Sequence, residues 1–178
     1  MPLPLINSIA SWILKKRIHQ IELFMKYPME VQEEILFGLL KSAENTVLGK
    51  KYDYSSIENY QTFNERIPVS TYEDLEPIIS QTRQGAQNIF WNSSIKYFAK
   101  SSGTTNAKSK FIPVSSEALE HNHYKGSKDL LCMYLNNNEN SQLFTGKSLR
   151  LGGSKELYEN NNTFFGDLSA ILIDNMPM

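Results

Sequence analysis

Serine, threonine and lysine side chains surround one glycine in the stretch 101–110, which reads SSGTTNAKSK. Gly103 allows the backbone to turn without a Cβ atom, so that several N–H groups can point into one concavity around a ligand. The hydroxyl groups add adjustable donors, and a lysine ammonium supplies positive charge. The candidate donors are Ser101, Ser102, Thr104, Thr105, Lys108 and Lys110. These residue types are typical of a loop that binds a polyphosphate.

The flanks of this loop indicate a strand on each side. Residues 95–99 are rich in strand-forming side chains, and residues 111–114 form a short apolar run. The loop is therefore expected to join strand to strand, whereas a Walker A loop leads from a strand into a helix. The stretch also lacks the second glycine of the Walker pattern, which excludes a Walker NTPase. An ordinary hydrophilic hairpin loop has a similar composition and stays open as an alternative.

Length and composition favour one globular domain of ordinary type. The 178 residues are 40% hydrophobic and 21% charged, as in an ordinary globular protein. The formal net charge of -1 lacks the excess of positive charge that is typical of nucleic-acid binding. Cys132 is the only cysteine, which excludes an intramolecular disulfide and favours the cytoplasm. The three histidines have no zinc-ligand spacing, so no metal site is predicted. The N-terminal residues read neither as a signal peptide nor as a membrane span.

Apolar periodicity predicts helices over most of residues 1–90. One helix is expected over residues 9–27, where apolar residues recur at steps of three and four. A second helix is expected over residues 28–43, because Pro28 suits a first helical position and a strong apolar stripe follows it.

A further helix is expected between Ser70 and Gly85. Ser70 lies three residues before Glu73, the spacing of a capping box, so Ser70 is the expected N-cap residue. Pro77 is expected to kink or restart this helix, because proline has no N–H group and its ring clashes with the preceding turn. Gly85 marks the end of the helix.

The remaining chain predicts an α/β fold class, in which N-terminal helices precede a mixed β-sheet with a strand-loop-strand phosphate loop in residues 91–178. Ser115 is the expected cap of a helix that ends at residues 136–138, which read NNN. Residues 143–151 read as a strand region with a turn. Residues 168–173 form a last apolar element.

Three segments together carry a resemblance to a known family: residues 71–75 (TYEDL), 101–105 (SSGTT) and 110–113 (KFIP). With these segments in view, the sequence resembles the auxin-responsive-promoter family of acyl-acid amido synthetases, which belong to the acyl-adenylate-forming superfamily. The resemblance runs through all 178 residues and implies that the loop is the family's first ATP motif. The residues that it implies as contacts of the β- and γ-phosphates are Ser101, Ser102, Gly103, Thr104, Thr105 and Lys110.

The resemblance implies a two-step ligase reaction. The carboxylate of an acid attacks the α-phosphate of Mg-ATP and releases pyrophosphate, and an amine, commonly that of an amino acid, then displaces AMP to form an amide. ATP and Mg²⁺ are the expected cofactors, and a small carboxylic acid and an amino acid are the expected partners. The loop is expected to act by binding and positioning, with no covalent nucleophile among its residues.

The resemblance also implies that the rest of the enzyme is absent from this chain. The family's later ATP motif, its ribose-binding aspartate and its mobile C-terminal domain would all lie beyond Met178. Residues 1–178 are therefore expected to be the N-terminal part of the large adenylating domain, inactive alone. Two alternatives stay open. One is an acyl-CoA ligase of the same superfamily, and the other is a non-catalytic helical module that binds a partner through Trp12, Ile13 and Leu14.

Overall fold

The chain divides into two compact units, each with its own packing. The computed structural model describes residues 4–101, 109–147, 149, 156–160 and 162–176. The first unit comprises residues 1–31 and 120–151, and the second comprises residues 32–119 and 152–178.

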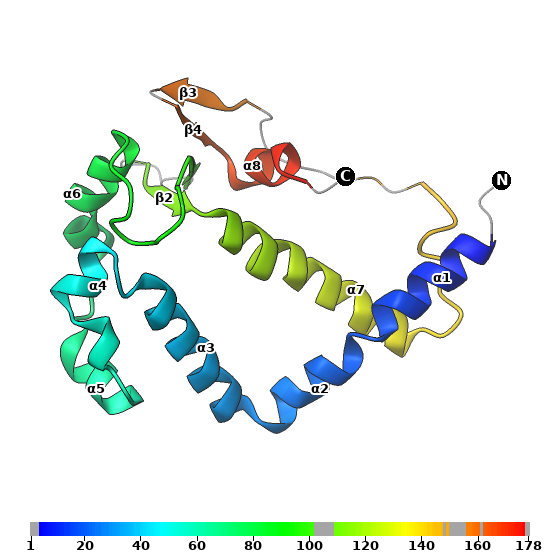
Figure 1. Ribbon diagram of the computed structural model, residues 1–178. Helices are drawn as coiled ribbons and strands as arrows, with labels where there is room; N and C mark the ends of the chain where they lie inside the picture. The colour runs from blue at the N-terminus through cyan, green and yellow to red at the C-terminus, as the bar shows by residue number, and fades with distance from the viewer. Residues whose placement is uncertain (1–3, 102–108, 148, 150–155, 161, 177–178) are drawn as a thin grey trace. The chain divides into compact units, whose positions relative to one another are not determined.

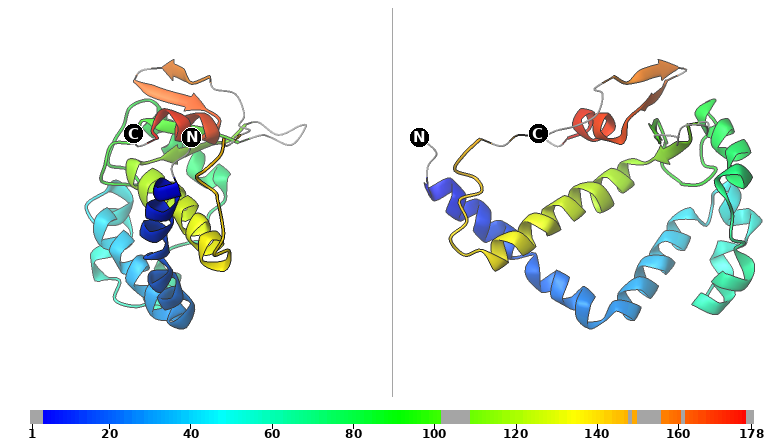
Figure 2. Two further views of the ribbon diagram at one scale, coloured as in Figure 1. Left: turned by 90° about the vertical axis from the view of Figure 1, so that its right-hand side faces the viewer. Right: turned by 180° about the vertical axis from the view of Figure 1, so that it is seen from behind.

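The first unit is built from α1 (Pro4–Lys15), α2 (Ile18–Lys26) and α7 (Lys125–Asn137). Both α1 and α2 contact α7, and Figures 1 and 2 show α1 crossing beside the C-terminal end of α7. The buried side chains of this unit include Ile21, Cys132 and Leu135. Burial raises the pKa of the Cys132 thiol, which suits a packing group better than a nucleophile.

The single helix expected over residues 9–27 is wrong, because the chain forms two helices that meet at Lys16 and Arg17. Arg17 Nε donates to Asp129 Oδ1 at 2.7 Å, and Arg17 Nη2 donates to Asp129 Oδ2 at 3.2 Å. This bidentate ion pair connects the junction between α1 and α2 to α7. Asp129 lies 112 positions further along the chain, so apolar periodicity near residue 17 carries no sign of the contact.

The second unit holds a four-stranded mixed sheet with the strand order β2-β1-β4-β3 (Figure 1). Its strands are β1 (Tyr97–Lys100), β2 (Phe111–Val114), β3 (Tyr158–Asn160) and β4 (Thr163–Gly166). Strand β1 pairs antiparallel with β2 and parallel with β4, and β3 pairs antiparallel with β4. The expected mixed sheet and the strand-loop-strand arrangement are therefore confirmed.

Helices and short helical turns flank this sheet in sequence. They are α3 (Pro28–Ala43), α4 (Val47–Lys51), η1 (Tyr54–Ser56), α5 (Tyr60–Arg66), α6 (Tyr72–Arg83), η2 (Ala118–Tyr124) and α8 (Leu168–Asp174). Helix α6 contacts β2, and α8 contacts β1. Ser115 caps the segment that follows β2, since its Oγ accepts a hydrogen bond from Ala118 N–H at 3.1 Å. None of the helices in the described part of the chain has the length and apolar character needed to cross a bilayer.

The core of the second unit lies between α6 and the sheet. Phe98 is fully buried and packs with Ile79 and Ile95. The ring of Phe98 stacks on that of Phe165 with centroids 5.6 Å apart, and Phe111 meets Phe165 edge-on at 5.7 Å. A fully buried side chain of this size contributes about 1.5–3 kcal/mol. The ring contacts join the three strands to one another, and Ile79 of α6 packs on this cluster.

The expected N-cap of α6 is wrong. The N-cap residue is Thr71, whose N–H donates to Asp74 Oδ2 at 2.8 Å and whose Oγ1 accepts from Asp74 N–H at 3.3 Å. This pair has the same spacing as Ser70 and Glu73, so spacing alone does not separate the two registers. Helix α6 continues through Pro77 without a restart, and the kink that was the other expectation for this residue stays a prediction. The capping box and the buried face of α6 outweigh the roughly 3 kcal/mol that an interior proline costs.

The expected chain reversals are partly correct. Gly85 follows the end of α6 with a φ of 104°, a backbone conformation that favours glycine. Residues 143–146 form turns and bends and residue 147 is not in a strand, so the strand expected there is wrong for residues 143–147. Residues 148, 150 and 151 of that region lie outside the described residues.

Gly49 in α4 leaves no room for a side chain, because a Cβ atom there would overlap the carbonyl oxygen of Ala43. We expect Gly49→Ala to lower the free energy of unfolding by about 1–3 kcal/mol, the usual cost of forced overpacking. Gly38→Ala in α3 is the matched control, since nothing lies within 4 Å of its Cβ position. Alanine should raise stability there by about 0.5–1 kcal/mol. Urea unfolding measures both variants, and a Gly49→Ala protein as stable as wild type would contradict the prediction.

Candidate phosphate-binding site

Strands β1 and β2 form the stem of the loop 101–110. Ser101 N–H donates to the Lys110 carbonyl at 2.9 Å, and Lys110 N–H donates to Ser101 Oγ at 3.2 Å. Two of the predicted phosphate-binding residues therefore close the base of the loop on each other. The other predicted residues, Ser102, Gly103, Thr104 and Thr105, lie outside the described residues, as does Lys108. Their contact with phosphate stays a prediction.

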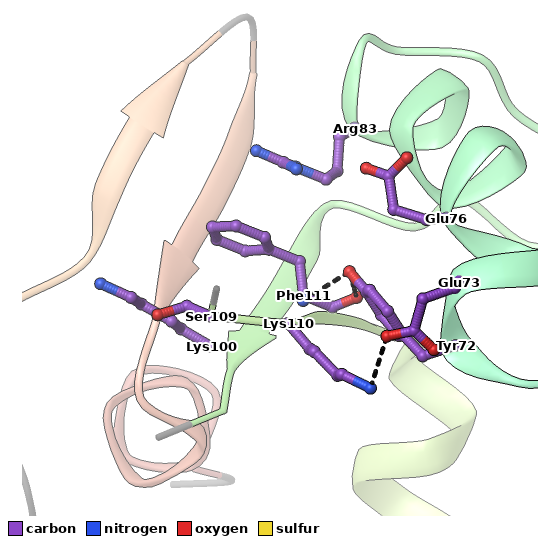
Figure 3. Close-up of a pocket in the computed structure, with 8 residues that line it drawn as sticks. All are labelled: Tyr72, Glu73, Glu76, Arg83, Lys100, Ser109, Lys110 and Phe111. Atoms are coloured by element: carbon purple, nitrogen blue, oxygen red, sulfur yellow. Dashed lines mark hydrogen bonds and ion pairs between the residues drawn. The ribbon is translucent and has the colours of Figure 1, made fainter. Parts of the chain in front are cut away.

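A cavity of about 930 Å³ opens beside this stem (Figure 3). Its walls come from α6, from the end of β1, and from the start of β2 with the two residues before it. The lining residues are Tyr72, Glu73, Glu76, Arg83, Lys100, Ser109, Lys110 and Phe111. The returning arm of the loop, through Ser109 and Lys110, thus faces side chains of α6.

The Lys110 side chain contacts two residues of α6. Its Nζ lies 3.0 Å from Glu73 Oε1 and 4.8 Å from the centroid of the Tyr72 ring. The hydrogen bond from Lys110, aided by the backbone N–H of Glu73 itself, lowers the pKa of the Glu73 carboxyl. The two side chains are 42% and 71% exposed, so this ion pair adds little to stability. Another anion can therefore replace the Glu73 carboxylate beside Lys110 at a small cost in free energy.

Tyr72 joins α6 to the start of β2. Its hydroxyl accepts a hydrogen bond from Phe111 N–H at 2.9 Å and makes a longer, weaker contact with the Phe111 carbonyl at 3.5 Å. Since Lys110 is already bonded to Ser101, its backbone is fixed on both sides. Sequence reasoning assigned no role to Tyr72, although the residue lies in the TYEDL segment.

Arg83 ends α6 and lies over aromatic rings of the sheet. Its guanidinium carbon is 3.9 Å from the centroid of Phe111 and 5.3 Å from that of Phe165, and Figure 3 shows the side chain extending over the Phe111 ring. Arg83 Nε is buried and has no hydrogen-bond partner among the described residues. A second cavity of about 470 Å³ lies on this side and shares Arg83, Lys100 and Phe111 with the first. Sequence reasoning missed Arg83 altogether.

Metal-ligand chemistry in the described part of the chain is limited. No group of three or more His, Cys, Asp or Glu side chains gathers there in a way that would hold a metal ion. Of the two carboxylates that line the larger cavity, Glu73 pairs with Lys110, whereas Glu76 has no ion pair or hydrogen bond with another described residue. Mg²⁺ typically binds through substrate phosphates plus one or two carboxylates, and Glu76 fits that donor set.

The apolar patch at Trp12, Ile13 and Leu14 belongs to the first unit. Trp12 and Ile13 are 61% and 55% exposed, and Leu14 is partly buried. The ammonium of Lys16 lies 3.5 Å from the centroid of the Trp12 ring. A cation from the chain's own helix junction therefore covers part of the patch, which is a smaller apolar surface than the sequence alone indicates.

Comparison with known protein families identifies the family of this chain. A model described as the GH3 family N-terminal domain matches residues 17–175. The chain belongs to the GH3 family. This match confirms the family of acyl-acid amido synthetases expected from the TYEDL, SSGTT and KFIP segments, and the matched range includes the stem of the loop 101–110.

Named GH3 relatives are synthetases several times longer than this chain. The indole-3-acetic acid-amido synthetase GH3.2 of Arabidopsis thaliana is 34% identical over 106 residues, which is 59% of this chain and 19% of the relative. The jasmonoyl–L-amino acid synthetase JAR6 of Nicotiana attenuata is 32% identical over 107 residues, or 60% of this chain and 18% of the relative. The GH3 chain thus spans about a fifth of the length of these two proteins.

A solved GH3 structure shares the fold of this chain. The structure titled GH3.15 acyl acid amido synthetase superposes with a TM-score of 0.78 and 21% sequence identity. The superposition covers 91% of this chain and 29% of that one. The expected fold class, helices followed by a mixed sheet as part of a larger fold, is confirmed.

Proposed function

We propose that this chain is the N-terminal part of the large adenylating domain of an acyl-acid amido synthetase. The enzyme would activate a carboxylic acid with ATP as an acyl-adenylate and transfer the acyl group to an amine, usually of an amino acid. One observation carries the proposal within the family. The SSGTT loop leaves β1 and returns to β2 with Lys110 lining a large cavity against α6.

In the proposed reaction, the loop and Lys110 bind the polyphosphate of ATP. A phosphate oxygen would take the place that the Glu73 carboxylate holds beside Lys110 Nζ. Lys110 would then neutralise charge on the departing pyrophosphate, which is preorganised electrostatic stabilisation. Tyr72 would act as a positioning residue through its hydrogen bonds to Phe111. Mg²⁺ bound to ATP would supply further charge neutralisation, and Glu76 is the described carboxylate best placed to share it.

We also propose that the enzyme works in the cytoplasm. The support is chemical, since the one cysteine is a free buried thiol and the chain has no capacity for an internal disulfide.

Acid-dependent exchange of labelled pyrophosphate into ATP tests the proposal on the enzyme expressed from its whole reading frame. Exchange should require a carboxylic acid from a panel of aromatic and aliphatic acids, and residues 1–178 alone should give none. Adding amino acids or coenzyme A separately then identifies the acceptor. We expect amino acids to release AMP. Release by coenzyme A alone would favour an acyl-CoA ligase, and no exchange with any acid would contradict adenylation.

A further inference from the structure

Two cations beside the phosphate loop lack a partner among the described residues. Neither the Arg83 guanidinium nor the Lys100 ammonium forms an ion pair with another described residue, and Arg83 Nε is buried without a hydrogen bond. A buried donor without an acceptor is costly, so such groups normally have a partner in the working protein. Of the carboxylates that line the two cavities, Glu73 pairs with Lys110, and Glu156 accepts a hydrogen bond from the Tyr158 hydroxyl at 2.7 Å.

The stacking of Arg83 leaves its hydrogen-bonding edge available. A guanidinium over an aromatic ring uses its flat face, while its N–H donors lie in its own plane. The faces that it covers are those of Phe111 and Phe165, which also line the smaller cavity with Lys100. The N–H groups of Arg83 therefore lie beside the apolar rings of Phe111 and Phe165. In such surroundings an ionic hydrogen bond is stronger than in water.

The place of this cavity in the sheet is that of a ligand site. Strand β1 ends at Lys100 and its parallel neighbour β4 ends at Gly166, and both residues line the smaller cavity. Ligands of open α/β sheets bind outside the carboxyl ends of parallel strands. Figure 3 shows Lys110 pointing toward Glu73, whereas Arg83 and Lys100 extend toward the opposite side of the view. The two free cations are thus separate from the contact that Lys110 makes.

We propose that Arg83 and Lys100 form an oxyanion-binding subsite next to the phosphate loop. The subsite takes a terminal phosphate of ATP or the carboxylate of an acid or amino acid substrate, since the arginine fork pairs with either kind of oxyanion. This inference rests on the proposed function, which supplies those substrates. Arg83 lies outside the TYEDL, SSGTT and KFIP segments, so the subsite adds a binding residue that the family motifs do not mark.

The test is steady-state kinetics of Arg83→Met and Lys100→Met in the enzyme expressed from its whole reading frame. Methionine keeps apolar bulk over Phe111 and removes the charge. We expect the KM of one substrate to rise about tenfold or more in each variant, the usual scale for losing an ionic hydrogen bond. A rise in KM for ATP identifies a phosphate, and a rise for the acid or the amino acid identifies a carboxylate. Arg83→Lys should recover part of the affinity.

Arg66→Met is the matched control, because Arg66 pairs with Asp53 and lines neither of the two cavities. Thermal unfolding of every variant separates binding from packing. If the KM values for ATP, the acid and the amino acid all stay within twofold of wild type in both methionine variants, the subsite is overturned. The subsite is also overturned if the variants lose kcat in proportion to a lower Tm while their KM values stay unchanged. If wild type itself shows no acid-dependent exchange, the proposed function fails. If wild type is active and the variants match it, only the subsite fails.

Discussion

Replacing Lys110 by alanine is expected to reduce acid-dependent ATP–pyrophosphate exchange by at least about 100-fold, the typical loss when one preorganised charge-stabilising group is removed from an active site. Lys110 is the described cation of the loop, and its Nζ lies on the cavity wall beside the exposed Glu73 carboxylate and the Tyr72 ring. Alanine leaves the backbone bonds to Ser101 intact, so the stem should persist. Exchange rates at saturating ATP and acid measure the effect.

Lys50→Ala is the control for a lost surface charge, since Lys50 is exposed in α4 and lines neither of the two cavities beside the loop. It should keep exchange at the wild-type rate. Lys110→Arg keeps the charge with a different geometry and should fall between wild type and alanine. Exchange by Lys110→Ala at the wild-type rate would remove Lys110 from the mechanism and leave any phosphate binding to the rest of the loop.

Replacing Phe98 by alanine is expected to lower the free energy of unfolding by about 3–5 kcal/mol, the range for a buried phenylalanine. Phe98 is fully buried, packs with Ile79 and Ile95, and stacks on Phe165. The free energy of unfolding of an ordinary domain is only about 5–15 kcal/mol, so this loss is a large share of the total stability. Because Phe98 lies in β1, the loop stem should weaken together with the core.

Guanidinium chloride unfolding measures this change, with Tyr60→Ala as the matched aromatic control. Tyr60 is 66% exposed in α5, and its loss should change stability by less than about 1 kcal/mol. A Phe98→Ala protein that unfolds at the same denaturant concentration as Tyr60→Ala would show that the aromatic core does not hold the unit together.

Local patterns predicted the framework of the loop correctly. The strand-forming run before residue 101 and the apolar run after residue 110 became β1 and β2, because each signal lies within a few neighbouring residues. The cap at Ser115 and the terminal apolar run, now α8, followed from equally local signals. Composition left the loop open between a phosphate loop and an ordinary hairpin, and the family segments favour the phosphate loop, which stays a prediction.

Contacts between distant residues were beyond the sequence. Arg83 meets Phe165, and Tyr72 meets Phe111, only because α6 packs across the sheet. The capping register of α6 was wrong by one residue, since Ser70 and Thr71 offer the same hydroxyl and the same spacing. The reciprocal hydrogen bonds between Thr71 and Asp74 distinguish the two registers.

Strand β1 receives its two neighbours at different times during synthesis. Phe98 pairs with Pro113 of β2 on one side and with Phe165 of β4 on the other. On a ribosome, the β1–β2 hairpin can close once residue 114 has emerged, whereas the other edge of β1 stays open until residue 166 follows. In that interval Phe98 lacks its stacking ring, and the open edge can pair with a neighbouring nascent chain. Synthesis therefore includes an interval in which this domain is open to misassembly through β1.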